Sequence, residues 1–121
     1  MSKELVTYLG TRFGQLLLQE GAWNGAQVLP EGFVDWMREP VAASKGVYGK
    51  GQVWIEGPGD EEAPGAGVAA GAPADTYWLE GHDGQSVAIV PSKRLVVVRL
   101  GLTPSKLGYR PQRLVAALAG E

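Results

Sequence analysis

The sequence predicts an α+β fold, in which a three-stranded antiparallel sheet packs against helices from the N- and C-terminal ends of the chain. Apolar residues near the N-terminus recur at the helical spacing of three to four. Three runs rich in β-branched and aromatic residues follow, and a tight turn separates the last two. Strands joined by a tight turn are antiparallel, so helices and strands should segregate. The length of 121 residues predicts a single domain over residues 1–121.

The N-terminal helix is expected to begin after Ser2, as its N-cap, and to stop at Gly21. Gly10 and Gly14 lie four residues apart in this helix, where each glycine costs about 1 kcal/mol relative to alanine. We therefore expect another backbone to approach this face of the helix closely. The apolar residues that predict the helix are Leu5, Val6, Leu9, Phe13, Leu16 and Leu17.

The next segment predicts a short hairpin followed by a second helix. Asn24-Gly25 is a strong signal for a two-residue hairpin turn, which Trp23 and Val28-Leu29 would flank. A proline suits the first turn of a helix over residues 30–38, and Pro40 would close it. The residues of this helix that are expected to face inward are Phe33, Val34 and Met37.

Residues 47–56 predict the first strand, with Val53 and Ile55 on one face and Trp54 on the other. Residues 57–75 are rich in Gly, Ala and Pro, a composition that does not form a packed element, so a long surface loop is expected. The acidic run in this loop matches no calcium-binding spacing and predicts a solvated turn. Its three members are Asp60, Glu61 and Glu62.

Residues 76–90 predict the second strand, and a turn over residues 91–94 leads to the third strand at residues 95–102. Consecutive valines in this third strand predict that it is either central in the sheet or buried on both faces. A last helix is expected to open at Arg110-Pro111, because proline suits the first helical turn. The residues on its predicted apolar face are Leu114, Val115 and Leu118.

The composition argues against several classes of function. A net charge of -2 and a pI of about 5.4 argue against a nucleic-acid partner, which would require a basic surface. With no cysteine, one histidine and no P-loop pattern, neither a metal nor another cofactor is expected. No run approaches the roughly 20 apolar residues of a membrane span, and the charged N-terminus is unlike a signal peptide. We expect a soluble protein, whose compartment the sequence does not identify.

Few residues could carry catalysis. Neither an S-x-x-K nor a G-x-S-x-G motif is present. His82, the only histidine, is followed by Asp83 in the tetrapeptide GHDG. Consecutive side chains of a strand point to opposite faces, so these two would not form a catalytic dyad there. The serines considered as nucleophiles are Ser2, Ser44, Ser86, Ser92 and Ser105.

Four segments carry a further pattern when they are taken in order. RFGQLLLQEGAWNGAQVLPEGFVDWM is similar to a helix-turn-helix in which the new helix follows W-x-G-x-x-L-P, with one more residue here between the glycine and Leu-Pro. VYGKGQVWIE is similar to a Y-G-x-G-W-W strand. YWLEGHDGQSVAIVPSKRLVVVRLG contains G-H-x-G-Q and P-S-x-x-L-V-V-V-R-L-G, and a C-terminal helix follows. Nearly the whole chain thereby resembles the C-terminal segment of the serine β-lactamase and penicillin-binding-protein superfamily, in its esterase and 6-aminohexanoate-dimer-hydrolase-like branch. The resemblance implies a partial β-lactamase-type fold.

The resemblance also implies a role for GHDG. The third catalytic motif of the superfamily, Lys-Thr-Gly or His-x-Gly, lies on the strand that walls the active site, and His82, Asp83 and Gly84 match it. By this match, His82 faces the cleft and helps to place a substrate carboxylate or a proton network. Gly84 leaves space for the substrate, and Gln85 supplies a backbone N–H to the oxyanion hole.

The chain departs from the family in its other two motifs. S-x-x-K supplies the nucleophile and base, Tyr-x-Asn or Ser-x-Asn supplies a further proton-transfer group, and neither occurs here. Both motifs lie upstream of this segment in the family, so we expect the C-terminal part of a larger hydrolase of small esters or amides, inactive alone. Its expected partner is the N-terminal segment of that hydrolase or a second copy of the chain. The alternative is a standalone binding or self-assembly module that reuses this part of the fold.

Overall fold

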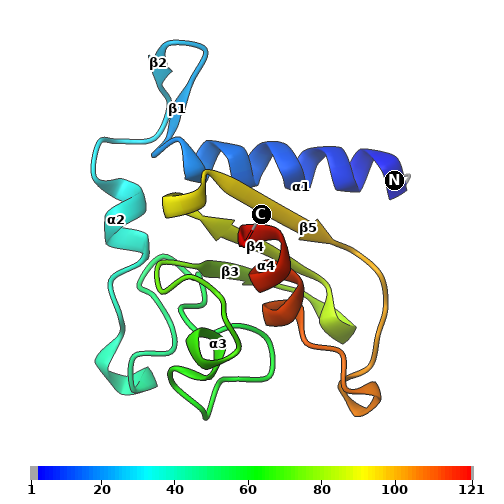
Figure 1. Ribbon diagram of the computed structural model, residues 1–121. Coiled ribbons are helices and arrows are strands. Elements are labelled where there is room, and N and C mark those ends of the chain that lie inside the picture. Colours follow the sequence, from blue (N-terminus) through cyan, green and yellow to red (C-terminus); the bar gives the residue numbers. More distant parts are fainter. Residues whose placement is uncertain (1–2, 121) are drawn as a thin grey trace.

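The computed structural model describes residues 3–120, with the side chains of residues 9–104 and 106–120. Over this part of the chain, helices at both ends and a three-stranded antiparallel sheet form the predicted α+β fold (Figure 1). The sheet has the order β3-β4-β5, with β3 at Tyr77–Glu80, β4 at Ser86–Val90 and β5 at Leu95–Arg99. The predicted fold class is therefore confirmed.

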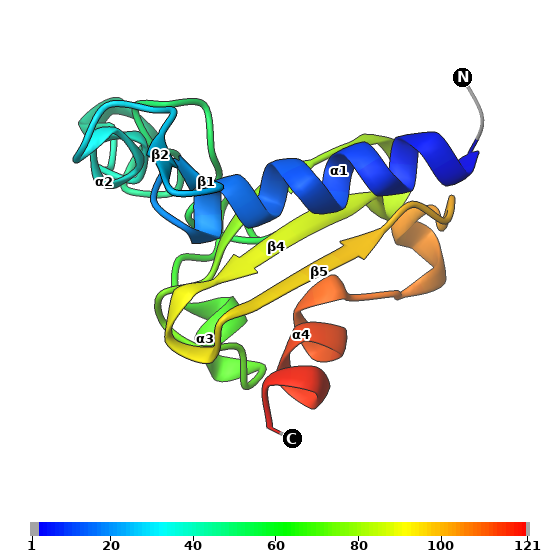
Figure 2. The same ribbon diagram turned by 90° about the horizontal axis from the view of Figure 1, so that it is seen from above.

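Helix α1 (Lys3–Leu18) covers one face of the sheet and α4 (Pro111–Ala119) covers the other (Figure 2). The side chains of β4 alternate between these two layers, as the pleat of a strand requires. All five residues of β4 are consequently buried, and β4 is the centre of the core. The α1 side of the core includes Leu17, Val87 and Ile89, and the α4 side includes Ala88, Val90 and Val115.

The predicted strand over residues 47–56 is wrong. This segment turns back on itself, because the N–H of Gly49 donates to the carbonyl of Val53 at 2.8 Å. Gly51 packs directly on Met37, so closely that a Cβ at this position would lie 2.3 Å from the Met37 side chain. Only an isolated bridge between Trp54 and Trp78, with N–H···O distances of 2.9 and 2.8 Å, joins the segment to β3.

The prediction of one strand over residues 76–90 is also wrong. This segment forms two antiparallel strands, β3 and β4, which pair so that Glu80 lies opposite Ser86. The third predicted strand is shorter than expected and forms an edge of the sheet, so the alternative of a central position is wrong, and burial on both faces is the alternative that remains. The two helical layers explain its apolar sequence, since they cover both faces of β5 without a second neighbouring strand. The turn before it forms as predicted, as a 3₁₀ turn at Pro91–Lys93.

Helix α1 ends at Leu18, and the left-handed residue of its C-terminal cap is Glu20, one residue before the expected Gly21. Glu20 adopts the left-handed conformation, with φ of 57°, and the N–H of Gly21 donates to the carbonyl of Leu16 at 2.9 Å. This pairing is the Schellman ending, in which the left-handed residue is most often glycine. The predictions for Ser2, Leu5 and Val6 lie outside the described residues and side chains.

Gly14 has a different neighbour from the one expected. A Cβ at Gly14 would lie 2.6 Å from Cγ1 of Val96 and 3.3 Å from Cγ1 of Val87, whereas one at Gly10 would lie 3.9 Å from Val98. Valine side chains of the sheet therefore approach the helix at Gly14, and the prediction that another backbone approaches it is wrong. The missing side chain lets α1 lie close to β4 and β5.

The hairpin after α1 forms at the predicted turn. Asn24 and Gly25 both have positive φ, at 49° and 79°, and join β1 (Ala22–Trp23) to β2 (Ala26–Gln27), so the partner strand lies earlier than expected. Helix α2 spans Phe33–Met37, which is shorter than predicted. Val34 and Met37 are buried as expected, but Phe33 is 37% exposed and its ring lies 5.5 Å from that of Trp36.

The remaining elements lie in the loops and at the C-terminus. Helix α3 (Ala66–Ala69) forms within the predicted loop, and 3₁₀ turns form at Ala42–Ser44 and Ser105–Leu107. Helix α4 begins after Arg110 as predicted, but Leu118 on its predicted apolar face is 41% exposed. Among the described residues, no helix is long and apolar enough to span a membrane.

Candidate functional site

The GHDG tetrapeptide forms the turn between β3 and β4, so its predicted place within a strand is wrong. Residues His82–Gly84 make a 3₁₀ turn, in which Asp83 and Gly84 have positive φ of 52° and 80°. The N–H of Gly81 donates to the carbonyl of Gln85 at 2.8 Å and closes the hairpin. Asp-Gly is a frequent hairpin-turn dipeptide because both residues tolerate positive φ.

The turn brings the side chains of His82 and Asp83 together. His82 Nε2 lies 3.1 Å from Asp83 Oδ2, so the expectation that the two point to opposite faces is wrong. That expectation requires an extended backbone, and Asp83 is in the left-handed conformation. The side chain of His82 is 83% exposed, so this contact lies in solvent, where ion pairs contribute little to stability.

The backbone N–H of Gln85 is engaged inside the turn. It donates to the carbonyl of His82 at 3.3 Å, and the Gln85 side-chain amide donates to the same carbonyl at 3.0 Å. In this conformation the N–H is directed at the turn itself. A role in an oxyanion hole, as the family resemblance implies, would require it to turn outward.

A cavity of about 520 Å³ lies beside the turn. Asp83 and Gly84 are among its lining residues, whereas His82 and Gln85 are not; Gln85 lines a smaller neighbouring hollow of about 220 Å³. The structure therefore separates the four predicted site residues into two that border the cavity and two that do not. The other main lining residues are Glu61, Glu80, Thr103, Tyr109 and Arg110.

Glu80, the last residue of β3, places a carboxyl group at this cavity. Burial, and next the nearby charges of Glu61 and Asp60, raise the pKa of Glu80 to about 8. Its Oε1 atom is buried and has no hydrogen-bond partner among the described residues. Sequence reasoning missed Glu80, although an acidic residue at the end of an apolar strand is a visible signal.

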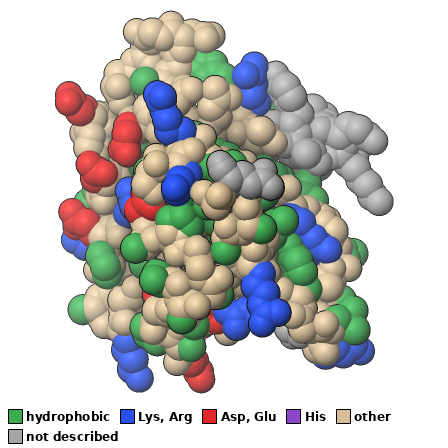
Figure 3. All heavy atoms as spheres, viewed as in Figure 1, with side chains coloured by type: hydrophobic (Ala, Val, Ile, Leu, Met, Phe, Trp, Pro, Cys, Tyr) green, Lys and Arg blue, Asp and Glu red, His purple; other side chains and the backbone are tan. Residues whose placement is uncertain are grey.

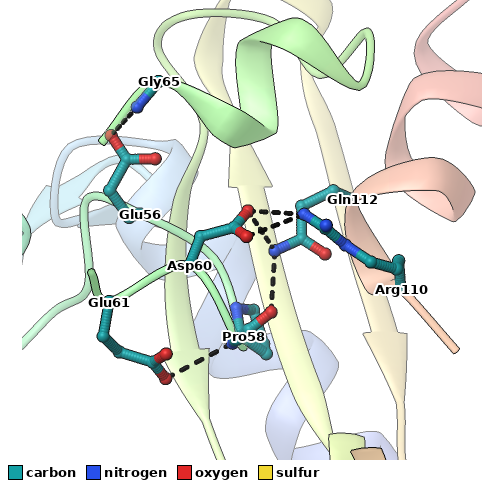
Figure 4. Close-up of polar contacts among 8 residues, drawn as sticks. Glu56, Pro58, Asp60, Glu61, Gly65, Arg110 and Gln112 are labelled. Atoms are coloured by element: carbon teal, nitrogen blue, oxygen red, sulfur yellow. Dashed lines mark hydrogen bonds and ion pairs between the residues drawn. The ribbon is translucent and has the colours of Figure 1, made fainter. Parts of the chain in front are cut away.

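Asp60 holds the loop from which Pro58, Gly59 and Glu61 line the cavity, and Figure 4 shows its polar contacts. Nη2 of Arg110 donates to both carboxylate oxygens of Asp60, at 2.8 and 2.7 Å, and Nε2 of Gln112 donates to Oδ2 at 2.9 Å. Asp60 is 2% exposed, so the prediction that this residue belongs to a solvated turn is wrong. The loop packs on the first turn of α4, where Gln112 also donates to the carbonyl of Pro58 at 2.9 Å.

Tyr109 and Arg110 complete the cavity wall. The guanidinium of Arg99 lies 4.4 Å from the centre of the Tyr109 ring and donates to Thr103 Oγ1. These two contacts hold Thr103 and Tyr109 beside the GHDG turn. The Tyr109 hydroxyl and the Arg110 Nε are buried without a hydrogen-bond partner among the described residues. Glu80 Oε1 is a third atom of this kind; all three residues line the cavity, but these three atoms are buried and do not face its open space.

Of the predicted serine nucleophiles whose side chains the structure describes, none lines this cavity. Ser44 Oγ donates to the carbonyl of Val41 at 2.6 Å, and Ser92 Oγ donates to Asp75 Oδ1 at 2.8 Å. Ser2 and the side chain of Ser105 lie outside the described part. In that part, no group of three His, Cys, Asp or Glu residues is placed to hold a metal ion.

No protein-family model matches the sequence, and no curated protein matches it. The resemblance to the β-lactamase superfamily rests on the sequence segments alone.

Proposed function

We propose that this chain supplies one wall of the active site of a β-lactamase-like serine hydrolase that acts on small esters or amides. The observation that carries the proposal is the run of four segments in the family's order. The antiparallel sheet between two helical layers is compatible with it, as is the polar cavity beside GHDG.

Within this proposal, the nucleophile and base come from a partner segment that carries S-x-x-K. Asp83 and Gly84 border the substrate, because both line the cavity. His82 reaches the partner segment from the outer side of the turn, where its side chain is exposed. Gln85 supplies its N–H to the oxyanion hole after the turn opens on assembly. The chain is inactive without its partner.

The experiment is complementation of ester hydrolysis. The chain is co-expressed with a segment of a superfamily esterase that carries S-x-x-K and Tyr-x-Asn, and turnover of a p-nitrophenyl ester is measured on the purified complex. We expect turnover only in the complex, and we expect His82→Ala and Gly84→Trp to lower it. Lys93→Ala, in the turn at the other end of β4, is the matched control and should leave turnover unchanged. An assembled complex without turnover would contradict the proposal.

A second candidate function is a binding or self-assembly module, and exposed apolar side chains favour it. Phe33 and Trp36 of α2 are 37% and 43% exposed, and they form an aromatic pair. Figure 3 shows acidic side chains on the side of the molecule where α2 lies. The exposed acidic residues in and beside α2 are Glu31, Asp35 and Glu39. Retention of a specific partner by the wild type, and its loss in Trp36→Ala, would support this function where complementation fails.

A further inference from the structure

Helix α2 carries apolar side chains on two faces. Val34 and Met37 are buried in the core and join the helix to the rest of the fold, whereas Phe33 and Trp36 are 37% and 43% exposed. Phe33 and Trp36 are three residues apart, so they share one face of the helix, and their ring centres lie 5.5 Å from each other. We call these two residues the α2 aromatic pair. Tryptophan is enriched among the residues that contribute most to binding at protein interfaces.

Negative charge surrounds the aromatic pair. Glu31 and Asp35 are exposed, and the ion pairs among the described residues include neither of them. Partial burial and, next, the charge of Asp35 raise the pKa of Glu20 above its usual value, so Glu20 lies near the same acids.

Two basic side chains in and near α2 already have partners. Lys50 forms an ion pair with Glu39 at 2.6 Å. Arg38 donates to the carbonyl of Asp75 at 3.1 Å, and its guanidinium lies 4.6 Å from the centre of the Tyr77 ring. These contacts leave Glu31 and Asp35 as charges that a binding partner can neutralise.

We propose that this surface binds a basic segment of a partner protein, in which an apolar side chain packs on the α2 aromatic pair and lysines or arginines pair with Glu31 and Asp35. Charge complementarity selects this occupant. The same acids would repel nucleic acid and an anionic membrane surface. A second copy of the chain fits less well, because its net charge is -2. The inference rests on the second candidate function and adds the chemistry of the partner to it.

The test titrates three capped hexapeptides into the wild-type chain at low salt. Arg-Lys-Leu-Leu-Arg-Lys supplies both features, Glu-Asp-Leu-Leu-Glu-Asp reverses the charge, and Arg-Lys-Ser-Ser-Arg-Lys lacks the apolar side chains. The amide signals of Phe33, Asp35 and Trp36 are followed by NMR. We expect the first peptide to bind roughly tenfold or more tightly than either of the others, and added salt to weaken its binding. No shift with the first peptide, or equal affinity for one of the other two, would overturn the proposal.

Variants locate the contact. Trp36→Ala should lower the affinity for the first peptide roughly tenfold, because the apolar side chain loses its packing partner. Leu107→Ala is the matched control, since Leu107 is 68% exposed in the 3₁₀ turn at Ser105–Leu107 and lies outside this surface. The double variant Glu31→Gln, Asp35→Asn should lower both the affinity and its dependence on salt. It changes only exposed side chains, so it provides the same test if Trp36→Ala does not fold. Wild-type affinity in both variants would show that the peptide binds elsewhere.

The failure of this inference is distinguishable from the failure of the second candidate function. If the wild type retains a partner that Trp36→Ala loses, but the first peptide does not bind, the binding function stands and the basic partner is refuted. Sedimentation velocity of the free chain tests the other occupant. A dimer that Trp36→Ala abolishes would place a second copy on α2 and would also overturn the proposal.

Discussion

Two neighbouring acidic residues, Asp60 and Glu80, have opposite environments, and of the two only Glu80 lines the cavity. Asp60 is almost fully buried but receives hydrogen bonds from Arg110 and Gln112, so its negative charge is compensated. Glu80 is partly buried, receives no such donor at Oε1, and lies close enough to Glu61 and Asp60 to be affected by their charges. Asp60 therefore joins the loop to α4, whereas Glu80 resists ionisation because its pKa is raised.

The first prediction is that Glu80→Gln flattens the dependence of folding stability on pH. The pKa of Glu80 is raised from 4.5 to about 8, so its stabilising contribution is fully present below pH 4.5 and is lost as the pH rises through 8. Allowing for the exposed part of the side chain, the wild type should lose on the order of 1 to 2 kcal/mol across this window, and Glu80→Gln should not.

The measurement is urea unfolding of both proteins at about pH 5 and about pH 9, with the free energies of unfolding compared at each pH. Glu62→Gln is the control and should keep the pH dependence of the wild type, because Glu62 is exposed. The same pH dependence in the wild type and Glu80→Gln would show that burial does not raise the pKa of Glu80.

At the scale of elements, the closest contact of α1 with the sheet lies at Gly14. The second prediction is that Gly14→Ala destabilises the fold by about 1 to 3 kcal/mol, because the new Cβ would lie 2.6 Å from Val96 Cγ1. Valine is branched at Cβ and has little freedom to move away. Gly10→Ala is the matched control: its Cβ would lie 3.9 Å from Val98, and helix propensity should stabilise it by a few tenths of a kcal/mol up to about 1.

Urea unfolding curves of the two alanine variants and the wild type provide the measurement. We expect Gly10→Ala to be the most stable of the three proteins, the wild type to be intermediate and Gly14→Ala to be the least stable. Equal stability of the two variants would indicate that α1 moves away from β5 at little cost, so that the small residue at Gly14 has no role in packing.

The elements with a local signal could be predicted from the sequence. Asn24-Gly25 specifies its turn because both residues tolerate positive φ, and the proline after Arg110 suits the first turn of α4. The strand over residues 47–56 could not be rejected locally, because its turn follows from packing of Gly51 on Met37, which is distant in the sequence. The edge position of β5 depends in the same way on helices that cover its two faces.

The candidate site was less predictable than the fold. Asp83-Gly84 is a hairpin signal, but the strand pattern on either side of it led to the interpretation of residues 76–90 as one strand. The burial of Asp60 depends on Arg110, which lies 50 residues away in the chain, and no spacing rule connects these two residues. Glu80 becomes significant only after the turn, the loop and Tyr109 enclose it in one cavity.

At the scale of the whole molecule, apolar groups remain exposed along one side. Leu9 and Phe13, one helical turn apart on α1, are each 47% exposed, and β5 beneath this helix is an edge of the sheet. Edge strands and exposed apolar patches both favour association with another chain. We therefore expect concentration-dependent self-association through α1 and the β5 edge, by strand pairing or by exchange of a terminal helix.

The third prediction is that Phe13→Lys shifts this equilibrium toward the monomer, because a charge in the contact must be desolvated when two copies meet. Sedimentation velocity over a range of protein concentrations measures the shift. Val68→Lys is the matched control: Val68 is 54% exposed on α3, which lies on the side of the sheet away from α1 (Figure 2). A wild-type chain that stays monomeric at high concentration would refute self-association, and equal effects of the two lysines would place the contact elsewhere.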